Sequence, residues 1–401
     1  MKKIVGIIAA AALAATAFAE INIGSWNRAV FVPFHYDGST LRSYEGRSWD
    51  ADTTGGVRTG LSFSGSTDNA GFVMEVHGNP GNALELGSNA YTWVKPVDML
   101  TVKFGKIDNN WGRLDHCFGT WDLWRFSNEE GEGIGGVGRQ NGLGAEVTLQ
   151  PVEGLVIDYE ANFSGDTNHT YDVMWESASF MVGYQADFGF IRAIVNGQQA
   201  SYYKFDDTDT KPAAQIGIAA DITAIENLTL KLGASLPTNL SGYVPDTSTD
   251  PAVIVPGLGA VKTTGYVKAA VGADYKLDPI TIHGQVNLAV NPKKVEDAKV
   301  QLGTIGLNIG AGIDYAINDT FTVVTDVRFT TDKYTLNGYS LADNEFTYKD
   351  SAFGAYLGLT QNLTNASFSF GAQFGKHVLP TAATEADAFT FAVPFTMTVS
   401  F

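Results

Sequence analysis

Hydrophobic and polar positions alternate with a period of two along much of the chain. The clearest stretch is 389–401, where seven apolar side chains occupy the odd positions and small or polar ones the even positions. Successive side chains of a β-strand point to opposite faces, so this pattern predicts a strand with one apolar and one polar side. A strand of a soluble sandwich has the same alternation. A strand that crosses a bilayer needs about 9 to 11 residues, and this segment of 13 residues is long enough. The length therefore favours a membrane strand.

The same alternation recurs upstream with less purity and divides the chain into 18 expected strands. They lie near 21–31, 56–65, 70–78, 89–95, 99–107, 141–150, 154–163, 177–187, 189–198, 213–223, 226–236, 263–276, 279–290, 303–317, 320–331, 351–361, 366–376 and 387–401. Long and short connections alternate between them, which is typical of transmembrane barrels and has no reason to occur in sandwiches. The predicted fold class is all-β: a transmembrane antiparallel up-and-down β-barrel. We expect 18 strands, with 16 as the alternative. Short turns on the periplasmic side and long loops on the extracellular side should connect them.

Two local features refine this prediction. Pro394 lies on the polar side of the last strand, where its missing N–H predicts a bulge or a weakly paired position. Aromatic residues near strand ends lie where the interfacial girdles of a membrane barrel are expected. They are Tyr91, Trp93, Tyr184, Phe188, Tyr275, Tyr315, Phe321 and Tyr334.

The N-terminus carries the pattern of an export signal. Lys2 and Lys3 precede an apolar stretch at 4–15 that is too short to span a bilayer as a helix, and 17–19 reads A-x-A, a cleavage motif. We expect a cleaved Sec signal peptide at 1–19 and a single barrel at 20–401. No later run of 18 apolar residues predicts a transmembrane helix. Cys117 is the only cysteine, so no intrachain disulfide can form.

The charge balance argues against a nucleic-acid partner. The chain has 26 Lys+Arg against 43 Asp+Glu, a formal net charge of −17, and no basic stripe. The G-x-G-x-x-G match at 131–136 lacks the preceding buried strand and the following helix of a dinucleotide site. Asp115, His116 and Cys117 are adjacent and lack zinc-ligand spacing. We therefore expect no enzyme activity, no catalytic residue, no cofactor and no metal.

The closing sequence Thr396-Met397-Thr398-Val399-Ser400-Phe401 resembles the final strand of the outer-membrane β-barrel porins of diderm bacteria. The export signal and hairpins such as 225–230 extend the resemblance over nearly the whole mature chain. The opening stretch 23–31 is similar to the first strand of spirochaete porin-like proteins. The resemblance thus covers porins of Gram-negative bacteria and of spirochaetes.

This resemblance implies a location in the cell outer membrane, in contact with its lipid. It also implies that the outer-membrane barrel assembly machinery reads the terminal strand, whose apolar side carries Phe395, Met397, Val399 and Phe401. Porins with 16 or 18 strands are often trimers. A homotrimer is therefore part of the same expectation.

The longest connection, 108–140, is the candidate constriction of the channel. In porins of this general kind the corresponding loop folds into the barrel, so the resemblance implies an inward fold here. The alternative is a solvated, mobile surface loop, since long loops are often but not always functional. Charged groups at a constriction tune ion selectivity. The charged candidates are Asp108, Arg113, Asp115, Asp122, Arg125, Glu129, Glu130, Glu132 and Arg139.

The same loop contains Trp111, Trp121 and Trp124, three of the seven tryptophans of the chain. Aromatic faces beside charged groups suit the stacking of sugars, which makes these three residues candidates for sugar binding. A hydrophobic cluster that packs the loop against itself is the simpler interpretation, because compact loops commonly pack on their own side chains.

A barrel of 16 to 18 strands leaves an aqueous channel, and strand parity predicts which charges line it. The main set is Arg28, Arg58, Glu75, Lys103, Asp158, Glu160, Arg192, Lys231, Asp326 and Arg328. The same parity adds Glu146, Asp187, Asp221, Lys268, Asp274 and Asp314. Acid slightly exceeds base, which predicts a modest cation preference. Three functions remain: passive diffusion of small hydrophilic solutes, a sugar- or solute-selective channel, and a non-conducting surface barrel that acts as adhesin or antigen.

Overall fold

The computed structural model describes 18 separate parts of the chain. They are residues 20–36, 41–42, 57–78, 84–109, 111, 141–162, 178–196, 202–204, 207–211, 215–237, 244–246, 260–262, 267–290, 305–331, 336–340, 345–348, 351–376 and 389–401. These residues contain no helix that is long and apolar enough to cross a membrane.

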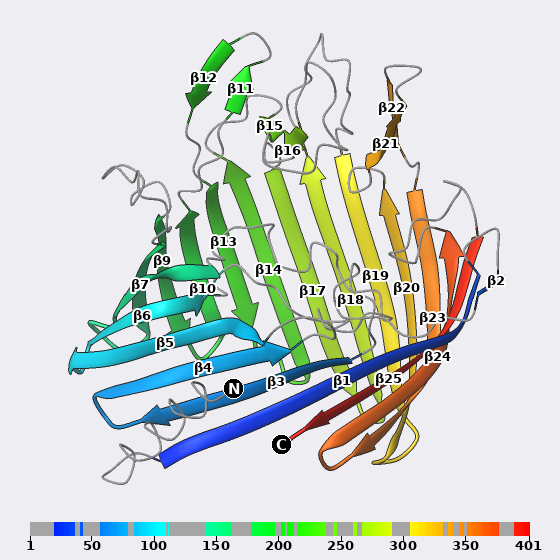
Figure 1. Cartoon of the computed structure of the whole chain (residues 1–401), viewed down its shortest axis with the longest axis horizontal. Coiled ribbons are helices and arrows are strands. Elements are labelled where there is room, and N and C mark those ends of the chain that lie inside the picture. Colours follow the sequence, from blue (N-terminus) through cyan, green and yellow to red (C-terminus); the bar gives the residue numbers. More distant parts are fainter. Residues whose placement is uncertain are drawn as a thin grey trace.

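The main sheet closes on itself as a barrel (Figure 1). Neighbouring strands pair antiparallel in chain order, and β1 pairs with both β3 and β25, which joins the two ends of the sheet. The sheet contains 19 strands, and 18 of them form the wall once the two-residue β2 (Leu41–Arg42) is set aside. This confirms the expected count and excludes 16.

The wall strands are close to the predicted segments. They are β1 (Glu20–Tyr36), β3 (Val57–Ser66), β4 (Ala70–Gly78), β5 (Glu85–Val97), β6 (Leu100–Asp108), β7 (Asn141–Leu149), β8 (Leu155–Asn162), β9 (Ala178–Ala186), β10 (Gly189–Asn196), β13 (Gln215–Ile222), β14 (Leu228–Pro237), β17 (Val267–Leu277), β18 (Ile280–Val290), β19 (Ile305–Ala316), β20 (Phe321–Thr331), β23 (Ser351–Leu363), β24 (Ala366–Lys376) and β25 (Phe389–Ser400).

Three short hairpins that the sequence pattern did not predict lie within long connections. They pair β11 (Tyr202–Lys204) with β12 (Asp207–Lys211), β15 (Val244–Asp246) with β16 (Ala260–Lys262), and β21 (Leu336–Ser340) with β22 (Glu345–Tyr348). The opposite ends of the strands are joined by tight turns with local side-chain support. Between β19 and β20, the Asn318 side chain accepts hydrogen bonds from the backbone N–H groups of Thr320 and Phe321, both at 2.9 Å.

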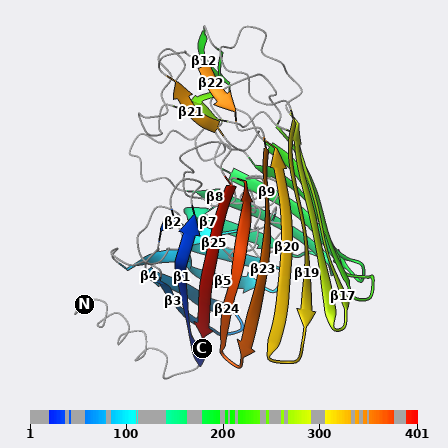
Figure 2. The ribbon, with the colours of Figure 1, turned by 90° about the vertical axis from the view of Figure 1, so that its right-hand side faces the viewer.

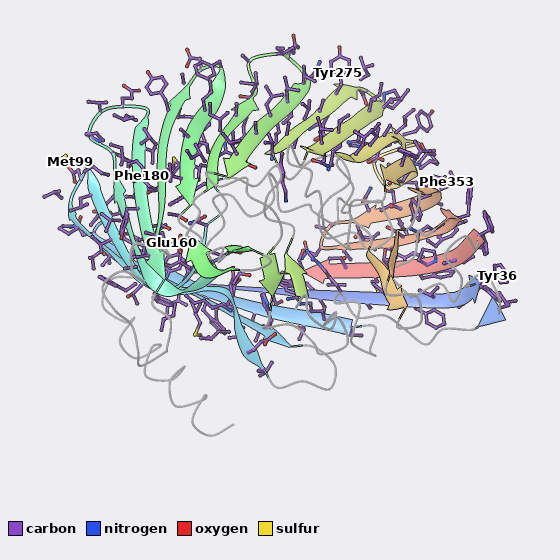
Figure 3. The ribbon with its side chains drawn as sticks, turned by 90° about the horizontal axis from the view of Figure 1, so that it is seen from above. Tyr36, Met99, Glu160, Phe180, Tyr275 and Phe353 are labelled. Atoms are coloured by element: carbon purple, nitrogen blue, oxygen red, sulfur yellow. The ribbon has the colours of Figure 1, made fainter. Side chains whose placement is uncertain are left out.

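The two faces of the wall differ sharply in polarity, as the period of two predicts. Along β18, Ile282 and Val286 are exposed on the outside of the barrel, whereas His283 and Gln285 between them are buried on the inside. Figure 3 shows Met99, Tyr275 and Phe353 directed away from the ring of strands, and Glu160 directed into it. A continuous apolar exterior of this extent matches acyl chains rather than water. The barrel is therefore the transmembrane type.

The aromatic prediction is correct only for part of the set. Tyr184, Tyr275 and Tyr315 are exposed on the outer face next to short turns, where an interfacial girdle lies. Tyr91 and Trp93 are instead on the inner face. The Lys103 ammonium lies 5.5 Å from the Tyr91 ring centroid, and Trp93 is directly opposite Lys103 in the ladder. Their position near a strand end therefore predicted how deep these rings lie in the membrane, but not which face of the wall they occupy. Tyr334 lies outside the described residues.

The seam between the first and last strands contains the bulge predicted at Pro394. In the ladder, Phe31 is opposite Phe395 and Phe34 is opposite Val393, so two residues of β1 face Pro394 alone. One of those two is Pro33, which also lacks an N–H. The strands remain joined on both sides of the bulge, and Figure 2 shows β25 between β1 and β24.

Phe401 completes this seam at the other end of the strand. Its N–H donates to the Ser25 carbonyl, and its carbonyl accepts from the Ser25 N–H, both at 2.8 Å. Further along, the Phe395 ring stacks on Phe370 of β24 with centroids 5.9 Å apart. The outer faces of β24 and β25 thus carry a patch of stacked aromatic rings.

Candidate pore-lining site

The inner face of β7 and β8 carries three carboxylates, Glu146, Asp158 and Glu160, which we call the acidic wall. Glu146 is directly opposite Glu160 in the ladder. It is also opposite Lys103 of β6, with which it forms an ion pair. Like charges directly opposed across two strands are unfavourable, and Lys103 offsets one of them. Lys103 and the nearest of these carboxylates, Glu146, are more than 40 residues apart in the sequence. Only the register of the strands brings them together.

The chain after β6 runs onto this wall. The Asn109 side-chain amide donates a hydrogen bond to the Glu160 carboxylate, and Glu160 is 0% exposed. Two residues later, the Trp111 carbonyl accepts a hydrogen bond from Nε of Arg192 on β10. The same guanidinium holds Asp221 of β13 at 2.6 Å through Nη1.

The Trp111 side chain packs on an apolar part of the inner face. Met181 of β9 and Ile194 of β10 form a buried pair, and Trp111, Val156 and Phe190 pack against it. These residues share the inward phase of Arg192, so the first residues of the long connection lie against the inside of the wall. Their contacts hold the start of the segment 108–140 in place.

Two oxygens of the acidic wall have no hydrogen-bond partner among the described residues. They are Oδ1 of Asp158 and Oε1 of Glu160, both buried. Buried carboxylate oxygens are normally paired because their desolvation is costly. The acidic wall thus retains unused acceptor capacity beneath Asn109.

A second group of charges lies on the inner face of β17 to β19. Nδ1 of His283 is 2.6 Å from Asp274, its ladder partner on β17, and Nε2 is 3.2 Å from Asp314 of β19. The contact with Asp274 is a hydrogen bond, whereas the contact with Asp314 lies within ion-pair distance and lacks hydrogen-bond geometry. Gly312, which is opposite His283, is also opposite the buried Asp326 of β20. A row of ladder partners therefore carries two carboxylates, Asp274 and Asp326, and one histidine across four strands, and Asp314 lies on β19 next to this row.

A third group is basic and lies on β1, β3 and β4. Arg28 and Arg58 are direct ladder partners, and both guanidinium groups lie over the Trp26 ring. Glu75 of β4 shares the inward phase and accepts a hydrogen bond from the Asn89 backbone N–H at 3.1 Å. Lys231 of β14 is the ladder partner of Asp221, which in turn forms the ion pair with Arg192 of β10.

Most of the predicted constriction lies outside the described residues. Asp108 ends β6 in the strand phase of Phe104, which is exposed on the outer face, and the residues after it, Asn109 and Trp111, contact the inner wall. Arg328 is described through its ladder positions opposite Gly310 of β19 and Gly354 of β23. The other loop candidates lie outside the described residues: Arg113, Asp115, Trp121, Asp122, Trp124, Arg125, Glu129, Glu130, Glu132 and Arg139.

Several inner-face residues were not singled out by the sequence. His283 lies on the polar phase of a clearly alternating segment, so its face could be found, but its two aspartate neighbours could not. The sequence pattern did not point to Asn109, because it follows the end of a strand. It did not point to Trp26 either, because an apolar side chain on the polar face does not fit the alternation. The fold and these groups together define a large barrel with an apolar exterior and a charged interior.

Comparison with known proteins finds solved structures that are similar to this chain. No protein-family model matches the chain, and no curated protein matches its sequence. The outer membrane channel DcaP of Acinetobacter baumannii is similar at 13% identity and a TM-score of 0.47, over 96% of this chain and 98% of that one. An anion-selective porin from Comamonas acidovorans is similar at 12% identity and a TM-score of 0.46, over 96% and 100%. OmpT of Vibrio cholerae, an outer membrane protein in a trimer form, has 10% identity and a TM-score of 0.49, over 96% and 99%.

Proposed function

We propose that this protein is a porin of the cell outer membrane, a water-filled channel through which small hydrophilic solutes diffuse passively. The observation that carries this proposal is the distribution of charge over the closed barrel. Ion-paired and hydrogen-bonded side chains recur on the inner face from β1 to β20, while the outer face is apolar. Barrels of this size leave a lumen that side chains alone do not fill.

The finer parts of the proposal concern the segment 108–140 and ion preference. The contacts of Asn109 and Trp111 with the inner wall support an inward course for the start of this segment, and hence a constriction within the barrel. The acidic wall and the row around His283 support a modest cation preference, because fixed negative charge raises the local concentration of cations. The packing of Trp111 on Met181 and Ile194 favours a structural role for that ring over sugar stacking.

Planar-bilayer recording of the refolded protein tests the channel directly. We expect discrete open-channel steps and, in a potassium chloride gradient, a zero-current potential of the sign set by potassium. A barrel without such steps would be the non-conducting adhesin or antigen, and a potential set by chloride would contradict the cation preference. Block by an oligosaccharide that is lost in Trp121→Ala or Trp124→Ala would instead favour a sugar-selective channel.

Two further expectations concern assembly. A homotrimer should appear as a single species of three chains by light scattering in detergent. Recognition by the barrel assembly machinery should require the apolar terminal strand, so deletion of Phe401, which is bonded to Ser25 at the seam, should lower the yield of folded barrel in the outer membrane. Wild-type yield from the deleted chain would contradict this.

A further inference from the structure

The two carboxylates of β8 lie beneath the start of the long connection. Asp158 and Glu160 are two residues apart on the inner face of this strand. Asn109 donates a hydrogen bond to Glu160. The ladder partner of Asp158 is Met181 of β9, and Trp111 packs against the buried pair to which Met181 belongs. The chain that follows β6 therefore covers this part of β8.

Both carboxylates are shielded from solvent and incompletely bonded. Glu160 is 0% exposed and Asp158 is 6% exposed. Oε1 of Glu160 and Oδ1 of Asp158 have no hydrogen-bond partner among the described residues. Burying a carboxylate is costly unless its oxygens are hydrogen-bonded or coordinate a metal ion. Each of the two side chains thus offers one buried oxygen to a ligand.

The charge of the acidic wall is only partly balanced. Glu146 forms an ion pair with Lys103. In the part of the chain that the structure describes, no lysine or arginine forms an ion pair with Asp158 or Glu160. Two negative charges therefore remain on one strand, about 7 Å apart along its axis. A divalent cation carries the charge that balances them.

We propose that Asp158 and Glu160 bind one Ca²⁺ ion between β8 and the chain that follows β6; we call this the calcium site. Ca²⁺ takes six to eight oxygen ligands in a flexible geometry and accepts carbonyl groups and water beside carboxylates. The described residues contain no group of three or more histidine, cysteine or carboxylate side chains that could hold a metal ion. The site accordingly uses two carboxylates, and neutral oxygens and water complete the coordination.

Mg²⁺ is the less suitable ion, because it demands near-ideal octahedral geometry and loses its water reluctantly. Bound Ca²⁺ neutralises the wall beneath Asn109 and so holds the start of the segment 108–140 against β8. This role is independent of the proposed channel function, since binding needs a folded barrel and no conduction.

Equilibrium binding of radiolabelled Ca²⁺ tests the site on the folded, full-length mature protein in detergent, after treatment with a chelator. We expect saturation at about one Ca²⁺ per chain with a Kd of about 0.1 to 1 mM, the range of weak calcium sites. Ca²⁺ should also raise the midpoint temperature of thermal unfolding, because an ion that binds only the folded state stabilises it.

Asp158→Asn and Glu160→Gln each preserve the size of the side chain and remove one charge. Either substitution should weaken Ca²⁺ binding about tenfold and abolish most of the rise in midpoint temperature. The matched control is Asp326→Asn, which removes a carboxylate from the inner face of β20 that is 2% exposed. It should change the affinity less than about twofold. Circular dichroism and unchanged electrophoretic mobility of the barrel establish that each variant is folded.

The outcomes separate the calcium site from the channel. Open-channel steps without saturable Ca²⁺ binding overturn the site and leave the channel intact, whereas Ca²⁺ binding without any steps overturns the channel and leaves the site intact. Equal loss of affinity in Asp158→Asn and Asp326→Asn overturns the site, because it would mean that only total charge matters. Competition by Mg²⁺ at the same concentration as unlabelled Ca²⁺ overturns the choice of ion.

Discussion

The acidic wall and the pair Arg28 and Arg58 pose the same electrostatic problem and resolve it differently. In each, two like charges are direct ladder partners: Glu146 with Glu160, and Arg28 with Arg58. The carboxylates are buried beneath chain that follows β6, with Asn109 bonded to Glu160. The arginines remain partly exposed on an aromatic platform. The opposed carboxylates are thus covered by Asn109, whereas the opposed arginines are supported by an aromatic side chain.

The largest effect is expected from removing the residue that holds the chain after β6 against the inner face, next to the acidic wall. Arg192 is buried and holds both the Asp221 carboxylate and the Trp111 carbonyl. Arg192→Met should lower the free energy of unfolding by about 3 kcal/mol, because it leaves an unpaired carboxylate and an unpaired carbonyl. Urea titration of the barrel in lipid vesicles measures this.

Lys268→Met is the control for Arg192→Met, since it also removes a positive charge from the inner face. Its effect should be about 1 kcal/mol or less. Equal destabilisation by the two substitutions would contradict the anchoring role of Arg192.

Trp111→Ala tests whether the start of 108–140 is held by packing. The substitution leaves a cavity against Met181 and Ile194, and for a partly buried ring we expect a loss of about 2 kcal/mol. If this segment narrows the lumen, single-channel conductance should rise or become noisier in the same variant. Wild-type stability together with wild-type conductance would show that Trp111 does not hold the segment.

Gly60→Ala tests the packing of the Trp26 indole beneath Arg28 and Arg58. The added methyl group overlaps this indole, so the expected cost is about 1 to 2 kcal/mol of overpacking. Gly284→Ala is the matched control, because nothing lies within 4 Å of a Cβ at that outward position. Its free energy of unfolding should stay within about 0.5 kcal/mol of wild type.

The smallest effect is expected from single charges in the row around His283. Asp274→Asn removes one carboxylate of the pair that flanks the imidazole, and it should lower the potassium-to-chloride permeability ratio by about twofold or less. Zero-current potentials in a salt gradient measure the ratio. A ratio that rises in this variant would contradict the assignment of cation preference to inner-face carboxylates.

Much of the fold was predictable, because strand alternation is a local property. The segments 70–78 and 366–376 match β4 and β24 to the residue. The first strand was predicted to end near residue 31, yet β1 continues to Tyr36. Pro33 interrupts the local strand signal there, and the strand continues because β25 pairs with it beyond the bulge.

The candidate site was predictable in kind and less so in detail. Parity assigned Asp158, Glu160, Arg192 and Asp326 to the inner face, and the structure buries all four on the polar side of their strands. It could not give the contact of Asn109 with Glu160, which joins residues 51 apart. Nor could it give the stacking of Arg58 on Trp26, because an isolated tryptophan on a polar face reads as an exception to the pattern.

The sequence by itself determined that each strand has one apolar and one polar side, because a period of two is written in consecutive residues. Only the tertiary structure decided which polar side chains meet. A ladder register depends on turns, bulges and the closure of the whole sheet, and shifting it by one pair changes every neighbour. The pairing of Arg28 with Arg58 and the position of His283 between two aspartates are properties of the closed barrel, and no stretch of the chain contains them.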